Sequence, residues 1–262
     1  MKLIINELSV FTQGDKQNRA IIFLHGFPFD HTAWHEQINQ LSSEYYCVSY
    51  DIRGLGESSV GDGQFTMDSF VDDLENLMSE MKLDKAILCA HSMGGYISLR
   101  ALEKMQDKFF AAILLDTVST ADANEGKLKR AAAIKRINTQ GLAPFVEDFI
   151  NLCYGDLYKQ KHPQEVEKRV QKSASFNPIG VKGCLLAMLS RTDTTQFLSE
   201  IKIPTLLLCG ENDTLTTPLA MMEMSKQIGN SEFVVIKNSG HMSAVENPTE
   251  VNSAIKSFLA KI

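Results

Sequence analysis

The sequence has little of several features that mark special classes of protein. Its 262 residues include one tryptophan, and aromatic residues make up only 8% of the chain. Basic residues are outnumbered, with 26 Lys and Arg against 32 Asp and Glu and a formal net charge of −6. A nucleic-acid-binding surface needs clustered positive charge, and a bilayer span needs about 20 mainly apolar residues in a row, which no segment approaches. We therefore expect neither a nucleic acid nor a membrane among the partners.

Cysteine is scarce, and its pattern is not that of a disulfide framework. The five cysteines include no C-x-x-C pair, and Cys47, Cys89 and Cys209 stand within apolar runs. An odd number in such settings indicates reduced thiols in the core, with no metal or other cofactor. The first eight residues have too short an apolar part for a signal peptide. We expect a cytoplasmic protein.

One segment does concentrate basic residues, but its pattern favours a solvated helix. Apolar residues separate its five basic residues, and charges on one side of a helix usually face water. We expect a solvated helix face here rather than a binding surface. The five residues are Lys127, Lys129, Arg130, Lys135 and Arg136.

Short apolar runs recur along the chain and have the character of buried strands. Most are continuously apolar rather than alternating, as strands covered on both faces should be. Helical patterns separate them, and this alternation predicts an α/β protein with a doubly wound, mostly parallel sheet of about seven or eight strands. The predicted strands cover residues 3–11, 20–24, 45–50, 86–89, 111–115, 205–209 and 233–236.

Two of the helical patterns are strong enough to place their first residues. Over residues 66–81, apolar residues recur at three- and four-residue intervals behind Thr66, a potential N-cap. Near the end of the chain, Val251, Ile255 and Phe258 fall on one face behind Thr249. We expect both threonines to cap their helices.

Residues 119–199 contain no convincing strand. Four helix-like stretches lie there, near residues 125–138, 144–153, 163–173 and 178–189, and the last three open with a proline, which suits a first helical turn. We expect residues 1–118 and 200–262 to form the core and residues 119–199 to form a helical cap inserted into it. Such a cap would close a pocket over the strand ends, where open α/β sheets bind ligands.

A serine stands between a strand and a helix in the segment "LCAHSMGGY", residues 88–96. In the nucleophile elbow, usually G-x-S-x-G, small neighbours allow a strained backbone that exposes the serine hydroxyl. Here the pattern reads Ala90-His91-Ser92-Met93-Gly94, in which alanine replaces the first glycine but is still small. This context favours Ser92 as a nucleophile.

A serine nucleophile needs a base and an orienting acid, which in this layout follow it in the order acid, then histidine. Asp213 comes after the strand at residues 205–209, and His241 comes after the strand at residues 233–236. Parallel strands bring both to the edge that carries Ser92, so we predict a catalytic triad of Ser92, Asp213 and His241. Asp116 is an alternative acid, while Glu211 and Glu246 are weaker candidates. His91 is a poor base, because adjacent side chains point apart.

Two backbone amides are candidates for an oxyanion hole. One is Met93, directly after the nucleophile, and the other is Phe27, in the loop after the strand at residues 20–24. Gly26 allows that loop to turn sharply, and we expect His25 to be structural. For the substrate pocket we predict contacts from Phe27 and from Phe145, Phe149 and Leu152, whose spacing allows one helix to present all three. The same spacing equally suits packing of the helical cap against itself or the core.

With these residues in place, the chain resembles the α/β-hydrolase fold superfamily. The resemblance runs nearly end to end, through "HGFPFDHTAW", "YDIRGLGESS", "AHSMGGY", "GENDTLTTP" and "SGHMSAVENP" in the family's order. Within the superfamily the chain is most similar to small bacterial carboxylesterases and enol-lactone hydrolases of the 3-oxoadipate type. The resemblance implies the same fold, a helical lid and acyl chemistry without a cofactor.

The expected activity is hydrolysis of a small carboxylic ester or lactone through an acyl-enzyme on Ser92. Dehalogenases and epoxide hydrolases of this fold use an aspartate at the nucleophile position, and serine argues against them. Carbon–carbon bond hydrolases and perhydrolases use the same triad, so they stay open alternatives, as does a non-catalytic ligand-binding protein. The expected partner is a small-molecule ester or lactone, and a homodimer is compatible with the sequence.

Overall fold

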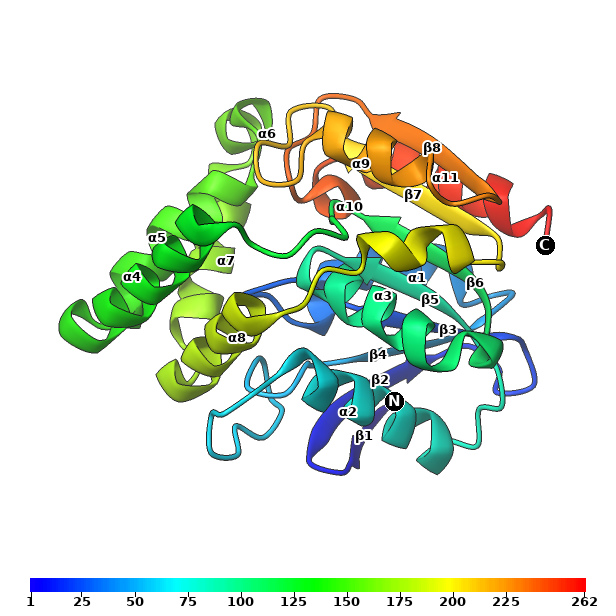
Figure 1. Ribbon diagram of the computed structural model, residues 1–262, viewed down its shortest axis with the longest axis horizontal. Coiled ribbons are helices and arrows are strands. Elements are labelled where there is room, and N and C mark those ends of the chain that lie inside the picture. Colours follow the sequence, from blue (N-terminus) through cyan, green and yellow to red (C-terminus); the bar gives the residue numbers. More distant parts are fainter.

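Eight strands form one sheet in the computed structural model, which describes all residues from Met1 to Ile262 (Figure 1). Their order across the sheet is β1-β2-β4-β3-β5-β6-β7-β8. The pairs β1·β2 and β2·β4 are antiparallel, and all other neighbours are parallel. This confirms the mostly parallel α/β sheet. The strands are β1 (Lys2–Ile5), β2 (Leu8–Gln13), β3 (Ala20–Leu24), β4 (Tyr46–Tyr50), β5 (Ala86–His91), β6 (Phe109–Leu115), β7 (Thr205–Gly210) and β8 (Ser231–Ile236).

The first predicted strand, residues 3–11, is wrong as a single element. It is a hairpin of β1 and β2, in which Ile5 pairs with Leu8 across a two-residue turn. Asn6 and Glu7 both have positive φ, 47° and 66°, as tight hairpin turns require. Glycine usually supplies that conformation, and because neither turn residue is a glycine, the turn was not predicted.

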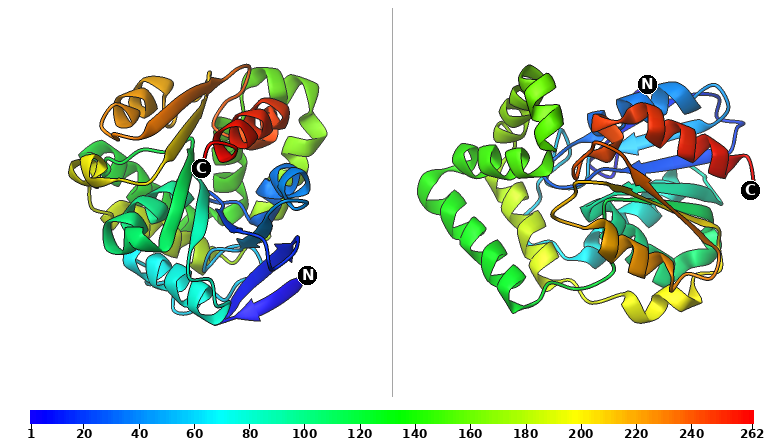
Figure 2. Two further views of the ribbon diagram at one scale, coloured as in Figure 1. Left: turned by 90° about the vertical axis from the view of Figure 1, so that its right-hand side faces the viewer. Right: turned by 90° about the horizontal axis from the view of Figure 1, so that it is seen from above.

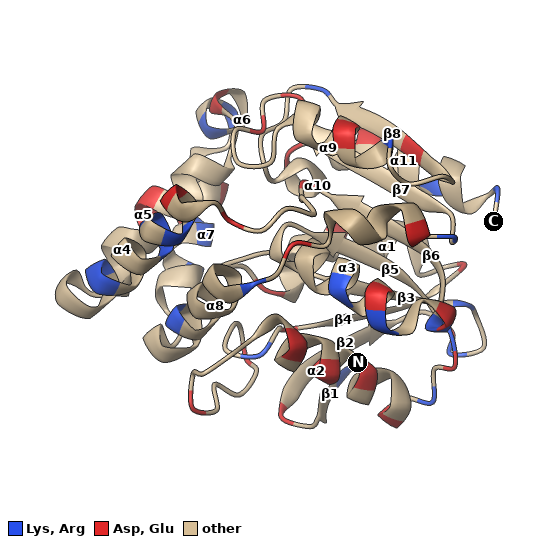
Figure 3. Ribbon diagram, viewed as in Figure 1, with Lys and Arg blue, Asp and Glu red and all other residues tan.

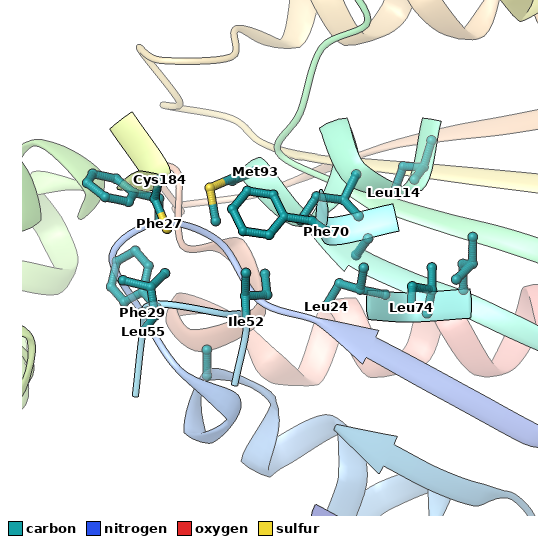
Figure 4. Packing of buried hydrophobic residues seen from close by; sticks show 14 of the residues in the cluster. Leu24, Phe27, Phe29, Ile52, Leu55, Phe70, Leu74, Met93, Leu114 and Cys184 are labelled. Carbon is teal, nitrogen blue, oxygen red and sulfur yellow. The ribbon is translucent and has the colours of Figure 1, made fainter. Parts of the chain in front are cut away.

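Helices cover both faces of the sheet because successive strand residues point to opposite sides. In β3, Ile21 and Phe23 belong to one buried cluster, and Ile22 and Leu24 belong to another. Figure 2 shows the sheet between the two helical layers, and Figure 4 shows part of the larger cluster, which joins strand residues to α2. The first cluster takes in α1 (His35–Leu41), α10 (Ser243–Glu246) and α11 (Pro248–Leu259), and the second takes in α2 (Met67–Glu80), α3 (Met93–Met105) and α9 (Pro218–Ser225).

The two predicted helix caps have different outcomes. Thr66 is the N-cap of α2, and it forms a reciprocal pair of hydrogen bonds with Ser69. The prediction for Thr249 is wrong, because Asn247 caps α11 by accepting from the Glu250 amide and Pro248 occupies the first turn. Proline suits that position because it lacks the amide hydrogen, so the cap moves to the residue before it.

Between β6 and β7, residues 119–199 contain five α-helices and most of a short 3-10 helix, Thr195–Glu200, but no strand. The α-helices lie together beyond one end of the sheet, at the left in Figure 1. Helix α6 was not predicted, since six residues give too short a periodic pattern. Helix α5 begins two residues before Pro144, the predicted start. The five are α4 (Asn124–Gln140), α5 (Leu142–Cys153), α6 (Asp156–Lys161), α7 (Pro163–Ala174) and α8 (Pro178–Ser190).

The thiols and helix lengths agree with two simple expectations. All five cysteines are buried and free, as predicted from their apolar surroundings. No helix combines the length and the apolar character that a bilayer crossing requires.

Candidate active site

Ser92 lies at the sharp turn between β5 and α3. Its backbone has φ 51° and ψ −115°, a strained combination for a residue other than glycine. A Cβ at Gly94 would lie 2.4 Å from the Leu24 carbonyl oxygen, so glycine there allows α3 to start against β3. Alanine fits at position 90 because this β5 residue does not have the positive φ that favours glycine, and its methyl group is small enough to be fully buried. The local geometry is therefore that of the predicted elbow.

The structure brings Ser92, His241 and Asp213 into direct contact. The Ser92 hydroxyl lies 2.8 Å from Nε2 of His241, and Nδ1 of the same ring lies 2.8 Å from Oδ2 of Asp213. A carboxylate can only accept, so Nδ1 carries the ring proton and Nε2 is left to accept from the serine. All three residues are buried. The arrangement can remove a proton from the hydroxyl and hold the charge that results on the ring.

The Asp213 carboxylate is fixed by groups that sequence reasoning missed. Its Oδ1 accepts from the amides of Leu215 and Thr216, and its Oδ2 accepts from the Thr216 hydroxyl at 2.6 Å. Burial alone would raise the pKa of Asp213, but His241 and these hydrogen bonds outweigh it and lower the pKa. The carboxyl is therefore ionised. Thr216 also lies 3.2 Å from Nδ1 of His241, and the only sequence signal for it is its place in the loop after the acid.

The pKa of His241 is raised. Burial lowers it, but the neighbouring charge of Asp213 and its hydrogen bond outweigh that effect. The ring is therefore a stronger base than a buried histidine without a carboxylate partner.

His91 does not compete with His241 for the serine. Its Nε2 donates to the His241 carbonyl oxygen at 2.7 Å, and burial lowers the pKa of His91 to about 3. The neutral ring therefore supports the backbone of the His241 loop. His25 is structural as expected, since its Nε2 accepts from the Ile52 amide at 2.9 Å and its Nδ1 lies 2.8 Å from the Gly26 carbonyl oxygen.

The alternative acids are engaged elsewhere. Asp116 accepts from the amide of Gly210 and from the amide and hydroxyl of Ser243, and so joins the loops that carry Asp213 and His241. Glu246 accepts from the amides of Gly155 and Met242, and Glu211 accepts from that of Asn238. None of the three hydrogen-bonds the His241 ring.

The two predicted oxyanion amides face no acceptor in the protein. Met93 is the first residue of α3, where an amide has no partner inside the helix. The Phe27 amide, in the loop after β3, donates to no backbone or side-chain acceptor. Both residues are buried, and Figure 4 shows their side chains within the larger cluster. The amides are available to a developing negative charge.

A cavity of about 440 Å³ opens above Ser92 and His241. Phe27 and Phe149 line it as predicted, whereas Phe145 packs behind them, with its ring centroid 6.2 Å from that of Phe27 and 5.8 Å from that of Phe149. The prediction for Leu152 is wrong. Leu152 is 52% exposed and lines a separate surface hollow beside the Asp213 loop, because it lies in the last turn of α5, beyond Phe149.

Three charged residues in the cavity wall were also missed: Asp122, Arg130 and Arg191. Arg130 belongs to the basic segment expected to be solvated. Its lysines are indeed exposed, but the Arg130 side chain is only 19% exposed and pairs with Asp122. Arg191 follows α8 and pairs with the other oxygen of Asp122 at 2.9 Å. Asp122 precedes α4 and Arg191 follows α8, so only the folded path of the chain brings both next to Arg130 on α4.

The helices α5 and α7 are tied to the loops of the site. The Cys153 carbonyl oxygen accepts from the His241 amide at 2.9 Å, and Gly155 donates to Glu246 at the same distance. From α7, the Ser173 hydroxyl donates to the Pro28 carbonyl oxygen at 2.7 Å. The helical region therefore supports the loops of His241 and Phe27 directly.

One group of potential metal ligands adjoins the site: Asp116, Cys209 and Asp213. The oxygens of both carboxylates already accept from protein donors. The Cys209 thiol donates to the Thr216 carbonyl oxygen, and burial raises its pKa. The donor set is therefore used within the protein.

Comparison with known proteins agrees with this architecture. The family model described as the alpha/beta hydrolase fold matches residues 19–248. The chain is 28% identical to 3-oxoadipate enol-lactonase 1 of Acinetobacter baylyi, over 97% of this chain and 94% of that protein. It is 32% identical to a malate-bound thermophilic esterase of Thermogutta terrifontis, covering 100% and 98% of the two chains with a TM-score of 0.94.

A solved enol-lactonase of Burkholderia xenovorans shares the fold at 21% identity, with a TM-score of 0.91 over 99% of this chain and 100% of that one. The matched segment contains Ser92, Asp213 and His241 together with the helical region between β6 and β7. The chain belongs to the α/β-hydrolase fold family.

Proposed function

We propose that this protein hydrolyses small carboxylic esters or lactones through an acyl-enzyme on Ser92. The observation that carries the proposal is the continuous chain of contacts from the Ser92 hydroxyl through His241 to Asp213, each 2.8 Å long. Enol-lactonase and esterase relatives that align over nearly the whole chain support the same class of reaction.

The first half of the reaction forms the acyl-enzyme. His241 Nε2 takes the proton of Ser92 as its oxygen attacks the carbonyl carbon, and Asp213 stabilises the charged ring. The amides of Phe27 and Met93 donate to the oxyanion that forms. The ring then returns the proton to the leaving oxygen, which departs as an alcohol or, from a lactone, stays attached to the acyl group.

The second half releases the acid. Water gives a proton to His241 and attacks the acyl carbon, the oxyanion forms again between the same two amides, and Ser92 recovers its proton from the ring. Each removed oxyanion donor would cost on the order of a hundredfold or more in turnover. In this proposal residues 119–199 act as a lid whose α5 closes the cavity with Phe149.

Short p-nitrophenyl esters test the proposal. We expect the native protein to release p-nitrophenol, and Ser92→Ala to lower kcat/KM by about 10⁴-fold or more. Ser98→Ala is the matched control, because Ser98 is also buried on α3 but lies outside the cavity. A fluorophosphonate probe should add its mass to the native protein and to Ser98→Ala, but not to Ser92→Ala. Equal turnover by Ser92→Ala and the native protein would overturn the mechanism.

A further inference from the structure

The cavity above Ser92 carries an excess of positive charge. Its charged lining consists of one carboxylate, Asp122, and two guanidinium groups, Arg130 and Arg191. These side chains are 13%, 19% and 5% exposed, so bulk water screens them poorly. Figure 3 shows basic residues on α4, the helix that carries Arg130, in a protein whose net charge is negative.

Both guanidinium groups keep N–H donors that the protein does not use. Arg130 contacts both oxygens of Asp122 through Nε and Nη2, and Arg191 Nη1 contacts one of the same oxygens, so the single negative charge of Asp122 cannot neutralise both cations. Arg191 also donates to the carbonyl oxygens of Met188 and Thr120, and its guanidinium lies over the ring of Tyr96. The remaining partner of Arg130 Nη1 is the Met188 thioether, a weak acceptor at 3.3 Å. Arg130, unlike Arg191, therefore has no carbonyl acceptor, and its Nη1 group meets only this weak one.

An arginine with free donors at a half-apolar wall favours an anionic ligand. Burying a charge without a partner is costly, and a carboxylate supplies both the opposite charge and the planar pair of acceptors that a guanidinium matches. The rest of the lining offers no further carboxylate, so nothing in the cavity repels such a ligand except Asp122, which is already paired.

We infer that the substrate carries a carboxylate besides the bond to be cleaved, and that Arg130 receives it, supported by Arg191. The inference rests on the proposed function for the cleaved bond, and it narrows the substrates to monoanionic esters or lactones. Arg130 is thus a specificity-determining residue, and Arg191 holds the wall in place.

A matched pair of esters measures the preference. p-Nitrophenyl hydrogen pimelate carries a free carboxylate that is too far along its chain to attack its own ester readily, and p-nitrophenyl methyl pimelate has the same chain with that group masked. We expect kcat/KM to be about 10- to 100-fold higher for the anionic ester, the size of a charge-assisted hydrogen bond. Equal values, or a preference for the neutral ester, would overturn the inference.

Variants on α4 test whether Arg130 causes the preference for the anionic ester. Arg130→Met should reduce the ratio of the two kcat/KM values to near one, mainly through KM of the anionic ester, and Arg130→Lys should restore part of it. Lys127→Met is the matched control, because Lys127 is exposed on the same helix, and it should keep the native ratio. If Arg130→Met keeps the ratio and only lowers the melting temperature, the pair with Asp122 serves the fold alone and the inference is wrong.

Binding to Ser92→Ala separates this inference from the proposed function. Calorimetric titration with monomethyl succinate should show tighter binding than titration with dimethyl succinate. Tighter binding of the monoanion without hydrolysis of any ester by the native protein would keep the anion site and reject the hydrolase. Equal binding of the two compounds would reject the anion site, whatever the activity.

Discussion

At the scale of the residue, His241 lies between two groups with opposite effects. Asp213 favours the charged ring, whereas Ser92 can give its proton only to a neutral one. The ring is buried, so both influences act at short range with little screening by water. Burial lowers the pKa of His241, but the charge and hydrogen bond of Asp213 outweigh burial and leave the pKa above its ordinary value, which suits a group that must first accept and then return a proton.

The activity should therefore fall on the acid side. Because the neutral ring is the base, kcat/KM for a p-nitrophenyl ester should drop as the pH falls through the raised pKa of His241. Asp213→Asn removes the charge that raises this pKa, so the His241 titration followed by NMR should move to lower pH. The variant should also lose about 10⁴-fold in kcat, since an amide can hold the wrong tautomer. A His241 pKa that is equal in the variant and the native protein would contradict this view.

The sequence contained enough to place these residues because each stands at a strand end, where chain order and sheet topology decide position. Thr216 and Arg130 escaped prediction for the opposite reason. The conformation of the loop after β7 places the Thr216 hydroxyl next to Asp213, and the ion pair with Asp122 keeps the Arg130 side chain away from the solvated side of α4. The position of Leu152 was not predictable for a similar reason. Helical spacing indicates which face of α5 carries a residue, but not how far the cavity extends along that face.

At the scale of the element, the fit between α3 and β3 sets the position of the site. Strands and long amphipathic helices were predictable because their periodicity reports burial directly. The β1–β2 hairpin and the cap at Asn247 were not, since both depend on the backbone conformations of one or two residues. Gly94 belongs with the predictable features: the elbow pattern requires a small residue there, and the close approach to Leu24 explains why.

Gly94→Ala should loosen this fit. The added methyl group would lie 2.4 Å from the Leu24 carbonyl oxygen, so α3 must move away from β3. We expect the free energy of unfolding in urea to fall by about 1–3 kcal/mol, as for overpacked sites, with a loss of turnover as the Met93 amide shifts. Gly229→Ala is the control, because nothing lies within 4 Å of its added methyl group, and it should change stability by less than about 0.5 kcal/mol. Equal stabilities of the two variants would contradict this account of the elbow.

At the scale of the whole molecule, the helical region and the sheet share one hydrophobic cluster. Val146 and Cys153 of α5 and Cys184 of α8 belong to the same buried set as Leu24 and Leu88 of the sheet. Packing of this kind joins the two parts energetically, so we expect them to unfold together rather than in turn.

Thiol labelling tests whether the helical region and the sheet unfold cooperatively. Cys153 and Cys184 lie in the helical region, and Cys47, Cys89 and Cys209 lie in the sheet. With Ellman's reagent we expect no rapid reaction of the native protein, and all five thiols should react at one rate as denaturant is added. Reaction of two thiols well before the other three would show that the helices open by themselves.

The hydrogen bond from the His241 amide to Cys153 has a consequence for engineering. Exchanging residues 119–199 for the corresponding segment of a relative would replace the cavity walls that we propose to select the substrate and, at the same time, the backbone that supports the His241 loop. A chimera of that kind should therefore keep the backbone of residues 153–155 from this chain, or lose turnover for reasons unrelated to the new specificity.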